Sequence, residues 1–292
     1  MRLHTISVIG LGQMGGPMAT HLLKAGFQVT GYDVSKAQLS NLIPLGLRTA
    51  RSAREAAKGA DLVLLSLPNW EVVKEVVEGK SGILSVLKKG QVIVDASTVP
   101  PWETVSMAKR LLKKGIYWMD VPVSGSAAEA REGDLVFMAG GPRSIFEKIK
   151  PVLDRVGRKT VYVGKNGQGA MLKLIVNHTL FLNQAAAVEG LTLARKSGID
   201  PDLVYDVMIS GAARSSLIVQ RGQDMLRHDF KGKGALAVAV KDIGLCLENA
   251  RRLGAPAPMG ALYQQFLLSA GRRGWKDMDA TSVMKIFEEL AG

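Results

Sequence analysis

The stretch Gly10-Leu11-Gly12-Gln13-Met14-Gly15 follows the apolar run Ile6-Ser7-Val8-Ile9 and opens a segment with helical periodicity. A G-x-G-x-x-G motif between a strand and a helix is typical of a loop that holds the pyrophosphate of a dinucleotide. In such a loop Gly10 permits the tight turn, Gly12 lets the backbone approach the phosphates, and Gly15 lets the helix pack against its strand. The helix start adds unpaired N–H groups and a partial positive charge. The alternative is a glycine turn without a ligand.

Asp33 lies at the end of the next expected strand, about twenty residues beyond the loop, where a carboxylate accepts hydrogen bonds from the ribose hydroxyls. A negative charge there repels the 2′-phosphate of NADP, whereas Lys36 nearby is a weaker signal for it. We therefore expect NAD as the cofactor, with NADP possible.

The first half of the chain alternates between strand and helix patterns. Expected strands cover residues 5–9, 28–32, 62–67, 91–95, 116–121 and 135–139, and expected helices cover 14–25, 36–45 and 103–114. This alternation predicts βαβ units and a parallel sheet covered on both faces.

The pattern becomes helical after Val163. Residues 170–196 contain no Pro and one Gly, which predicts a helix roughly 40 Å long. Further helices are expected at 203–209, 217–226, 235–252, 261–271 and 281–290. The predicted fold class is α/β: a Rossmann doubly wound sheet over 1–163, a connecting helix over 164–196, and an all-helical substrate and oligomerisation domain over 197–292.

The composition is that of an ordinary globular chain, with 47% apolar and 22% charged residues. Charged residues interrupt every long apolar run, so no membrane span is expected, and no cleavable leader is visible. The single cysteine, Cys246, excludes an internal disulfide and a multi-cysteine metal site. We expect no metal and a cytoplasmic location.

The net charge of +12 raises the question of nucleic-acid binding. Residues 1–162 carry 22 basic and 14 acidic residues, net +8, and the remainder carries 16 and 12, net +4. The basic residues fall in helix-like groups without interleaved aromatic residues, so solvated helix faces explain them. Attraction of an anionic cofactor and an acidic substrate is the simpler use of this charge.

Hydride transfer to nicotinamide requires an acid/base partner for the alcohol oxygen. Lys173 and Asn177 stand four residues apart near the start of the long helix, hence on one face. Apolar neighbours would desolvate the ammonium group and lower the lysine pKa. A lysine that extends to solvent is the equally weighted alternative. Ser124-Gly125-Ser126 follows a strand at the sheet edge where ligands bind, and its hydroxyl and N–H groups suit a carboxylate, although these residues alone slightly favour a plain serine turn.

Several motifs in order resemble the β-hydroxyacid dehydrogenase family, the relatives of 3-hydroxyisobutyrate dehydrogenase, over nearly the whole chain. The matching motifs are the glycine loop, Leu67-Pro68, Asp95-Ala96-Ser97-Thr98, Asp120–Ser126, Met138–Gly141, Gly167–Asn177 and Lys241-Asp242.

The resemblance implies a role for each motif. Lys173 would be the general acid/base, and Asn177 would hold the substrate and the lysine in register. Ser124, Gly125 and Ser126 would bind the substrate carboxylate. Leu67, Pro68 and Thr98 would line the cofactor channel, and Lys241 would reach the cofactor and substrate. The implied assembly is a homodimer or homotetramer, and the implied substrate is a small hydroxyacid or its semialdehyde.

Two departures from the family pattern concern the substrate. Ser126 replaces a usual glycine, and Gly234 stands where many relatives carry a Phe seven residues before Lys241. The missing ring predicts a larger substrate pocket, or another residue folded into the gap.

Three other functions are alternatives to a 3-hydroxyacid dehydrogenase. An imine reductase on this scaffold would lack the lysine, and a phosphorylated-hydroxyacid dehydrogenase would carry a longer helical domain. A non-catalytic dinucleotide-binding protein would be expected to lose Lys173 and the Ser124-Gly125-Ser126 turn, and both are present.

Overall fold

The computed structural model describes residues 3–232 and 234–292. The chain divides into two compact units, Met1–Lys173 and Leu174–Gly292.

The first unit is built on one sheet with the strand order β3-β2-β1-β4-β5-β6-β8-β7, and β9 pairs with β8. The first six strands in the chain run parallel. The bounds are β1 Thr5–Ile9, β2 Gln28–Tyr32, β3 Arg48–Thr49, β4 Leu62–Leu65, β5 Val92–Asp95, β6 Tyr117–Asp120, β7 Val123–Ser124, β8 Val136–Gly140 and β9 Lys159–Gly164.

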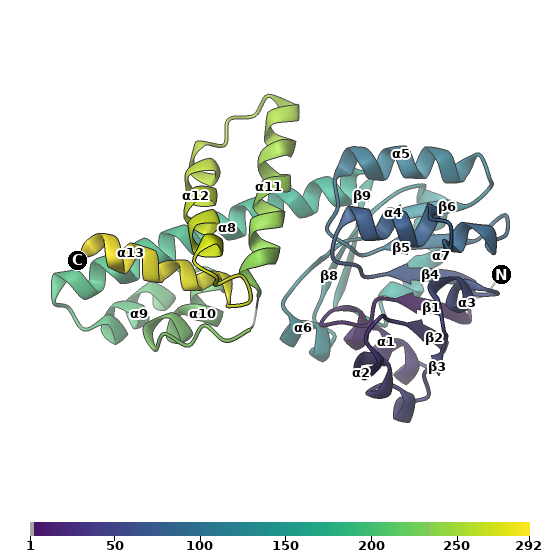
Figure 1. Ribbon diagram of the computed structural model, residues 1–292, viewed down its shortest axis with the longest axis horizontal. Coiled ribbons are helices and arrows are strands. Elements are labelled where there is room, and N and C mark those ends of the chain that lie inside the picture. Colours follow the sequence, from purple (N-terminus) through teal and green to yellow (C-terminus); the bar gives the residue numbers. More distant parts are fainter. Residues whose placement is uncertain (1–2, 233) are drawn as a thin grey trace. The chain divides into compact units, whose positions relative to one another are not determined.

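Helices cover both faces of this sheet (Figure 1). Alternate residues of β4 separate the two cores: Leu62 and Leu64 pack with α1, α6 and α7, whereas Val63 and Leu65 pack with α3, α4 and α5. The helices are α1 Gly15–Lys24, α2 Lys36–Ser40, α3 Ala53–Ala57, α4 Trp70–Glu78, α5 Pro101–Leu112, α6 Ala127–Glu132 and α7 Arg143–Leu153, with 3₁₀ turns η1 Ile43–Leu45 and η2 Ile83–Ser85. The predicted fold class is confirmed.

The prediction of a wholly parallel sheet is wrong for its last part. Strand β8 runs antiparallel to β6 and β7. A parallel return needs a crossover long enough to span the sheet, and the six-residue α6 extends only about 9 Å. The chain therefore returns to the sheet at the same end of the strands at which it left, and β8 runs in the opposite direction to β6 and β7. Helices α3, α4, α6 and α7 and strands β3, β7 and β9 are additional to the expected elements.

The expected helix at residues 36–45 is also wrong, because it breaks into α2 and the turn η1. Pro44 has no N–H to continue an α-helical ladder. Gly46 then adopts a φ of +97°, which ends the segment in the left-handed region.

The second unit contains most of α8 Gln168–Ser197, the long helix that the sequence predicts. It packs with α9 Pro201–Ser210, α10 Ser216–Leu226, α11 Leu236–Leu253, α12 Pro258–Arg272, η3 Ala280–Val283 and α13 Met284–Ala291 around a separate apolar core. Among residues 3–232 and 234–292, no helix combines the length and apolarity needed to cross a bilayer.

The start of α8 lies directly against strand backbone. A Cβ atom built on Gly169 would approach the Met138 carbonyl oxygen to 2.4 Å and the Asp120 carbonyl oxygen to 2.5 Å. A Cβ on Gly140 would meet the amide nitrogen of Gly169 at 2.7 Å. These two glycines therefore allow a close approach that no other residue permits.

We expect Gly169→Ala to lower the free energy of unfolding by about 2 kcal/mol, because the added methyl group overpacks the contact with strand backbone. Urea denaturation monitored by circular dichroism measures the loss. Gly271→Ala is the matched control, since a Cβ at this helical glycine meets nothing within 4 Å. Equal stability of the Gly169 variant and the parent would contradict the packing role.

Candidate active site

The glycine loop contains two kinds of glycine. Gly10 has a φ of +88°, and a Cβ there would lie 2.1 Å from the Ser66 carbonyl oxygen; a Cβ on Gly15 would lie 1.9 Å from the Gly10 carbonyl oxygen. The packing of the chain itself thus requires both. A Cβ on Gly12 would meet nothing within 4 Å. The folded chain does not need a glycine at this position, whereas close approach of a pyrophosphate does.

The start of α1 and the end of β2 lie next to the glycine loop, at the carboxyl end of the parallel strands. Leu11 donates its N–H to Asp33 Oδ2 at 2.7 Å, and Ser35 donates its N–H to Asp33 Oδ1 at 2.7 Å. Each carboxylate oxygen retains a second lone pair for a hydroxyl donor. Within the described residues, Met14 at the N-cap makes no side-chain capping bond, and Gln13 is exposed. These features fit a bound dinucleotide.

Leu67 and Pro68 follow β4, and Thr98 follows the adjacent strand β5. Leu67 donates its N–H to Ser97 Oγ at 2.9 Å, and Ser97 donates its own N–H to Asp95 Oδ1 at 3.0 Å. The two predicted channel segments are therefore joined by hydrogen bonds that end on a buried carboxyl group.

Asp95 is 1% exposed and is the register partner of Asp120 on β6. Burial raises the pKa of the Asp95 carboxyl to about 7; hydrogen bonds from Ser97 oppose the rise, and the Asp120 carboxylate adds to it. The Oδ2 atom of Asp95 has no hydrogen-bond partner within the described part of the chain. Burial therefore disfavours the charged form of Asp95.

Asp120 anchors the start of α8. Its Oδ1 accepts the Gly167 N–H at 2.9 Å, and its Oδ2 accepts the Ala170 N–H at 3.0 Å. Burial raises the pKa of Asp120, although these N–H donors lower it. Lys173 comes three residues after Ala170, on the next part of the helix, and is half-buried. A helix start normally leaves its first N–H groups unpaired, and here strand β6 supplies the acceptor.

The turn Ser124-Gly125-Ser126 follows β7 and leads into α6. Gly125 has a φ of +142°, which favours glycine. Ser126 and Glu129 form a reciprocal capping box: Ser126 donates its N–H to Glu129 Oε2 at 2.6 Å, and Ser126 Oγ accepts the Glu129 N–H at 3.3 Å. The N–H group of Ser126 is therefore already used, and its hydroxyl hydrogen is the donor that can bind a substrate carboxylate.

In the second unit, Asp242 holds two of the predicted site residues together. Asn177 donates an Nδ2 hydrogen to Asp242 Oδ2 at 2.8 Å, and Lys241 Nζ lies 2.7 Å from Asp242 Oδ1. Asn177 is 4% exposed and Asp242 is 6% exposed. The carboxylate thus fixes the amide orientation of Asn177 and neutralises the Lys241 ammonium group.

Several of these residues have roles that sequence reasoning did not assign. Asp95, Ser97, Asp120 and Asp242 stood inside matched motifs without a role, and Glu129 was not singled out. Asp120 and Asp242 have partners far along the chain: Asp120 and Gly167 are 47 residues apart, and Asp242 and Asn177 are 65 residues apart. Glu129, by contrast, lies three residues from Ser126. An acidic residue next to a candidate site residue, as in Lys241-Asp242, is the sequence signal that could have identified these partners.

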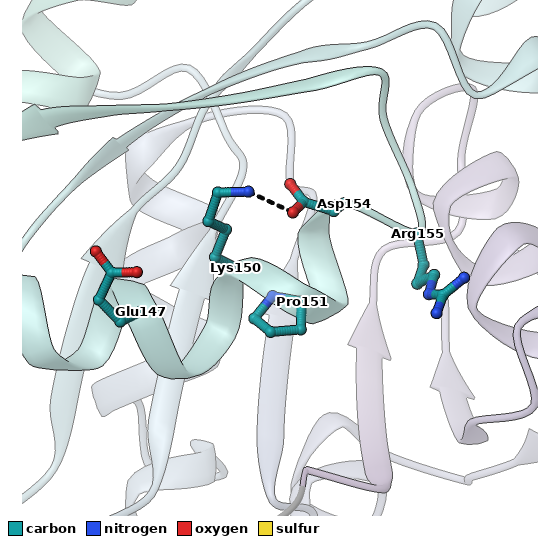
Figure 2. A pocket seen from close by; sticks show the side chains of 5 residues that line it. All are labelled: Glu147, Lys150, Pro151, Asp154 and Arg155. Carbon is teal, nitrogen blue, oxygen red and sulfur yellow. Dashed lines mark hydrogen bonds and ion pairs between the residues drawn. The ribbon is translucent and has the colours of Figure 1, made fainter.

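A surface hollow on the first unit contains none of the predicted site residues. It is lined by Glu147, Lys150, Pro151, Asp154 and Arg155, and Figure 2 shows Lys150 paired with Asp154 one turn along α7. Its charged and solvent-facing lining differs from the buried polar network at the carboxyl edge.

The fold and the carboxyl edge define a dinucleotide-binding protein of the Rossmann class. A family model described as the NAD binding domain of 6-phosphogluconate dehydrogenase matches residues 5–164. A second, described as NAD-binding of NADP-dependent 3-hydroxyisobutyrate dehydrogenase, matches residues 167–287.

Individual proteins agree with these models. A 2-(hydroxymethyl)glutarate dehydrogenase of Eubacterium barkeri is 35% identical and covers 98% of this chain and 96% of its own length. The crystal structure of a 3-hydroxyisobutyrate dehydrogenase from Salmonella typhimurium has a TM-score of 0.90 at 30% identity, over 97% of this chain and 99% of the other. The chain belongs to the β-hydroxyacid dehydrogenase family and is an NAD(P)-dependent hydroxyacid dehydrogenase.

An imine reductase from Pseudomonas sp. also resembles the structure, with a TM-score of 0.64 at 22% identity over 98% of this chain and 99% of the other. This likeness shows a shared fold alone. The predicted family and NAD(P) as the cofactor are confirmed, whereas the roles of individual site residues stay predictions.

We expect Asp95→Asn to be more stable than the parent at neutral and alkaline pH. The folded pKa near 7 lies above the unfolded value, so the contribution of Asp95 to stability is fully present below pH 4 and is lost as the pH rises to about 7. The difference between variant and parent should therefore grow over this window, to at most about 4 kcal/mol. Urea titrations at pH 4, 5.5 and 8 measure it, and a variant that is less stable than the parent at pH 8 would show that the ionised carboxylate is required.

Proposed function

We propose that this protein interconverts a 2-substituted 3-hydroxypropionate and its semialdehyde, with NAD as the preferred cofactor and Lys173 as the general acid/base. The observation that carries the proposal is that Asp120, at the carboxyl end of β6, accepts the N–H groups of Gly167 and Ala170 at the start of α8, three residues before the half-buried Lys173. The relatives support the substrate class, because 2-(hydroxymethyl)glutarate and 3-hydroxyisobutyrate both carry a hydroxymethyl group on the carbon beside the carboxylate.

In the proposed chemistry, a side chain of the protein transfers the proton of the substrate hydroxyl group. During oxidation the Lys173 amine takes the proton of the substrate hydroxyl, and during reduction the ammonium group returns it to the carbonyl oxygen. The bound nicotinamide accepts or supplies the hydride.

Substrate orientation is proposed to come from the turn after β7. Ser124 and Ser126 offer hydroxyl donors, and the positive φ of Gly125 turns the backbone without a side chain between them. Glu129 occupies the Ser126 N–H, so the carboxylate is bound chiefly through hydroxyl groups. Asn177 and Lys241, both held by Asp242, are proposed to contact the substrate.

The preference for NAD rests on Asp33. Both of its oxygens are held by backbone N–H groups next to the glycine loop, so the carboxylate cannot turn away from a ribose without losing two hydrogen bonds. A 2′-phosphate would meet this fixed negative charge at short range.

Gly234 is proposed to leave room for the 2-substituent. It is exposed, and a Cβ atom there would lie 3.7 Å from Asp279 Oδ2 and 3.9 Å from Arg221 Nη2, which are ordinary contact distances. Arg221 itself pairs with Asp279 at 3.7 Å. The space next to Gly234 is therefore open to a side chain or a ligand, with a cation and a carboxylate beside it.

The assembly is proposed to be a homodimer or homotetramer. The second unit exposes large apolar side chains on α8 and α9, including Leu193, Leu203 and Val207, which are 70%, 57% and 63% exposed. Apolar side chains of this size favour burial in a subunit interface.

We expect Lys173→Ala to lower kcat by about 10²–10⁴, the usual contribution of a general acid/base. The Kd for NAD should change by less than about twofold, because binding does not use the proton transfer. Stopped-flow and steady-state NADH absorbance measure kcat, and fluorescence titration measures the Kd. Near-parental turnover would remove Lys173 from the role.

A substrate panel run with NAD and NADP tests the remaining assignments. We expect 2-(hydroxymethyl)glutarate and 3-hydroxyisobutyrate to be oxidised faster with NAD than with NADP. Gly234→Phe should lower kcat/KM for the larger acid by about tenfold and affect the smaller acid less, so that the smaller acid serves as the internal control. An equal effect on both acids, or none, would show that Gly234 does not border the substituent.

A further inference from the structure

His21 on α1 reaches a second helix that the proposed chemistry does not use directly. Its Nε2 atom lies 3.1 Å from the Ala130 carbonyl oxygen and 3.1 Å from the Arg131 carbonyl oxygen. Carbonyl oxygens only accept hydrogen bonds, so Nε2 must carry the hydrogen and donate it to both. Figure 1 shows α6 beside α1, and the two helices are in contact.

The contact is shaped to the imidazole ring. The two carbonyl groups belong to the last turn of α6, where helices leave carbonyl oxygens without an intrahelical donor. Gly133, the C-cap of α6, has a φ of +75°, and a Cβ atom there would lie 3.2 Å from His21 Cε1. Ala130 is completely buried. His21 therefore adds a side-chain donor to the last turn of α6, where the Ala130 carbonyl oxygen also accepts the Gly133 N–H at 3.3 Å, and the glycine beside the ring leaves room for it.

The opposite end of α6 is the proposed substrate turn. Ser126 is the N-cap of α6 through its capping box with Glu129, so the turn and the helix form one hydrogen-bonded element. Six helical residues span about 9 Å, which is too short for the two ends to move independently. The other end of the linkage is α1, which begins at Gly15 of the glycine loop.

We infer that His21 is a positioning residue that couples the dinucleotide-binding helix α1 to the substrate turn Ser124-Gly125-Ser126. It touches neither substrate nor cofactor, and it acts by fixing α6 against α1. A dinucleotide that orders the start of α1 thereby also orders the groups that receive the substrate carboxylate. The inference rests on the proposed role of this turn.

The kinetic test compares His21→Leu, which cannot donate, with His21→Gln, which keeps an N–H donor at a similar reach. Lys24→Leu, on an exposed position of the same helix, is the matched control. For His21→Leu we expect the KM of the hydroxyacid to rise about fivefold, as for loss of one neutral hydrogen bond, with kcat and the Kd of NAD little changed. His21→Gln should restore most of the parental KM.

Hydrogen exchange provides a readout that needs no turnover. We expect addition of NAD to slow amide exchange across residues 126–133 in the parent, in Lys24→Leu and in His21→Gln, but not in His21→Leu. Should the parent turn over none of the acids in the panel, the proposed function fails, while the exchange experiment still decides the coupling. Equal slowing in His21→Leu, an unchanged KM, or no rescue by glutamine would overturn the inference.

Discussion

The hydrogen bonds between the Asp120 carboxylate and the start of α8 are the constraint on which the helix backbone leading to Lys173 depends. A carboxylate at the end of β6 receives the N–H groups of Gly167 and Ala170, and Gly140 and Gly169 let the helix come close enough for these bonds to form. This contact fixes the start of the helix that carries Lys173. Loss of the carboxylate would leave buried N–H groups unpaired, which costs more than the bonds themselves contribute.

A second buried carboxyl group next to Asp120 extends the same constraint across the sheet. Asp95 is its neighbour in register and holds Ser97, which in turn holds Leu67. Two negative charges in this buried space oppose each other, so the Asp120 carboxylate adds to the rise in the pKa of Asp95. The predicted cofactor-channel segments and the start of α8 are thus attached to adjacent strand ends, so the sheet fixes the distance between them.

Local patterns in the sequence were sufficient for much of the fold and part of the site. The glycine loop, Asp33 and the long helix depend on neighbours in the chain, and the structure contains each of them. The reversal of β8 depends on the length of α6, and the break in the helix at Pro44 depends on one missing N–H. Asp242 and His21 depend on partners 65 and 109 residues away, which no periodicity encodes. Ser126 is a different case, because Glu129 lies only three residues away and their capping box is a local pattern, which the family motif leaves aside when it assigns Ser126 to a ligand.

The glycine loop separates the demands of folding from those of binding. Gly10 and Gly15 are dictated by backbone atoms of the protein itself, whereas the surroundings of Gly12 leave space for a methyl group. Selection for a stable fold alone would therefore preserve the first and last glycines and tolerate drift at the middle one. If a descendant of this chain lost the ability to bind the nucleotide, Gly12 is the first glycine of the loop at which we expect a substitution.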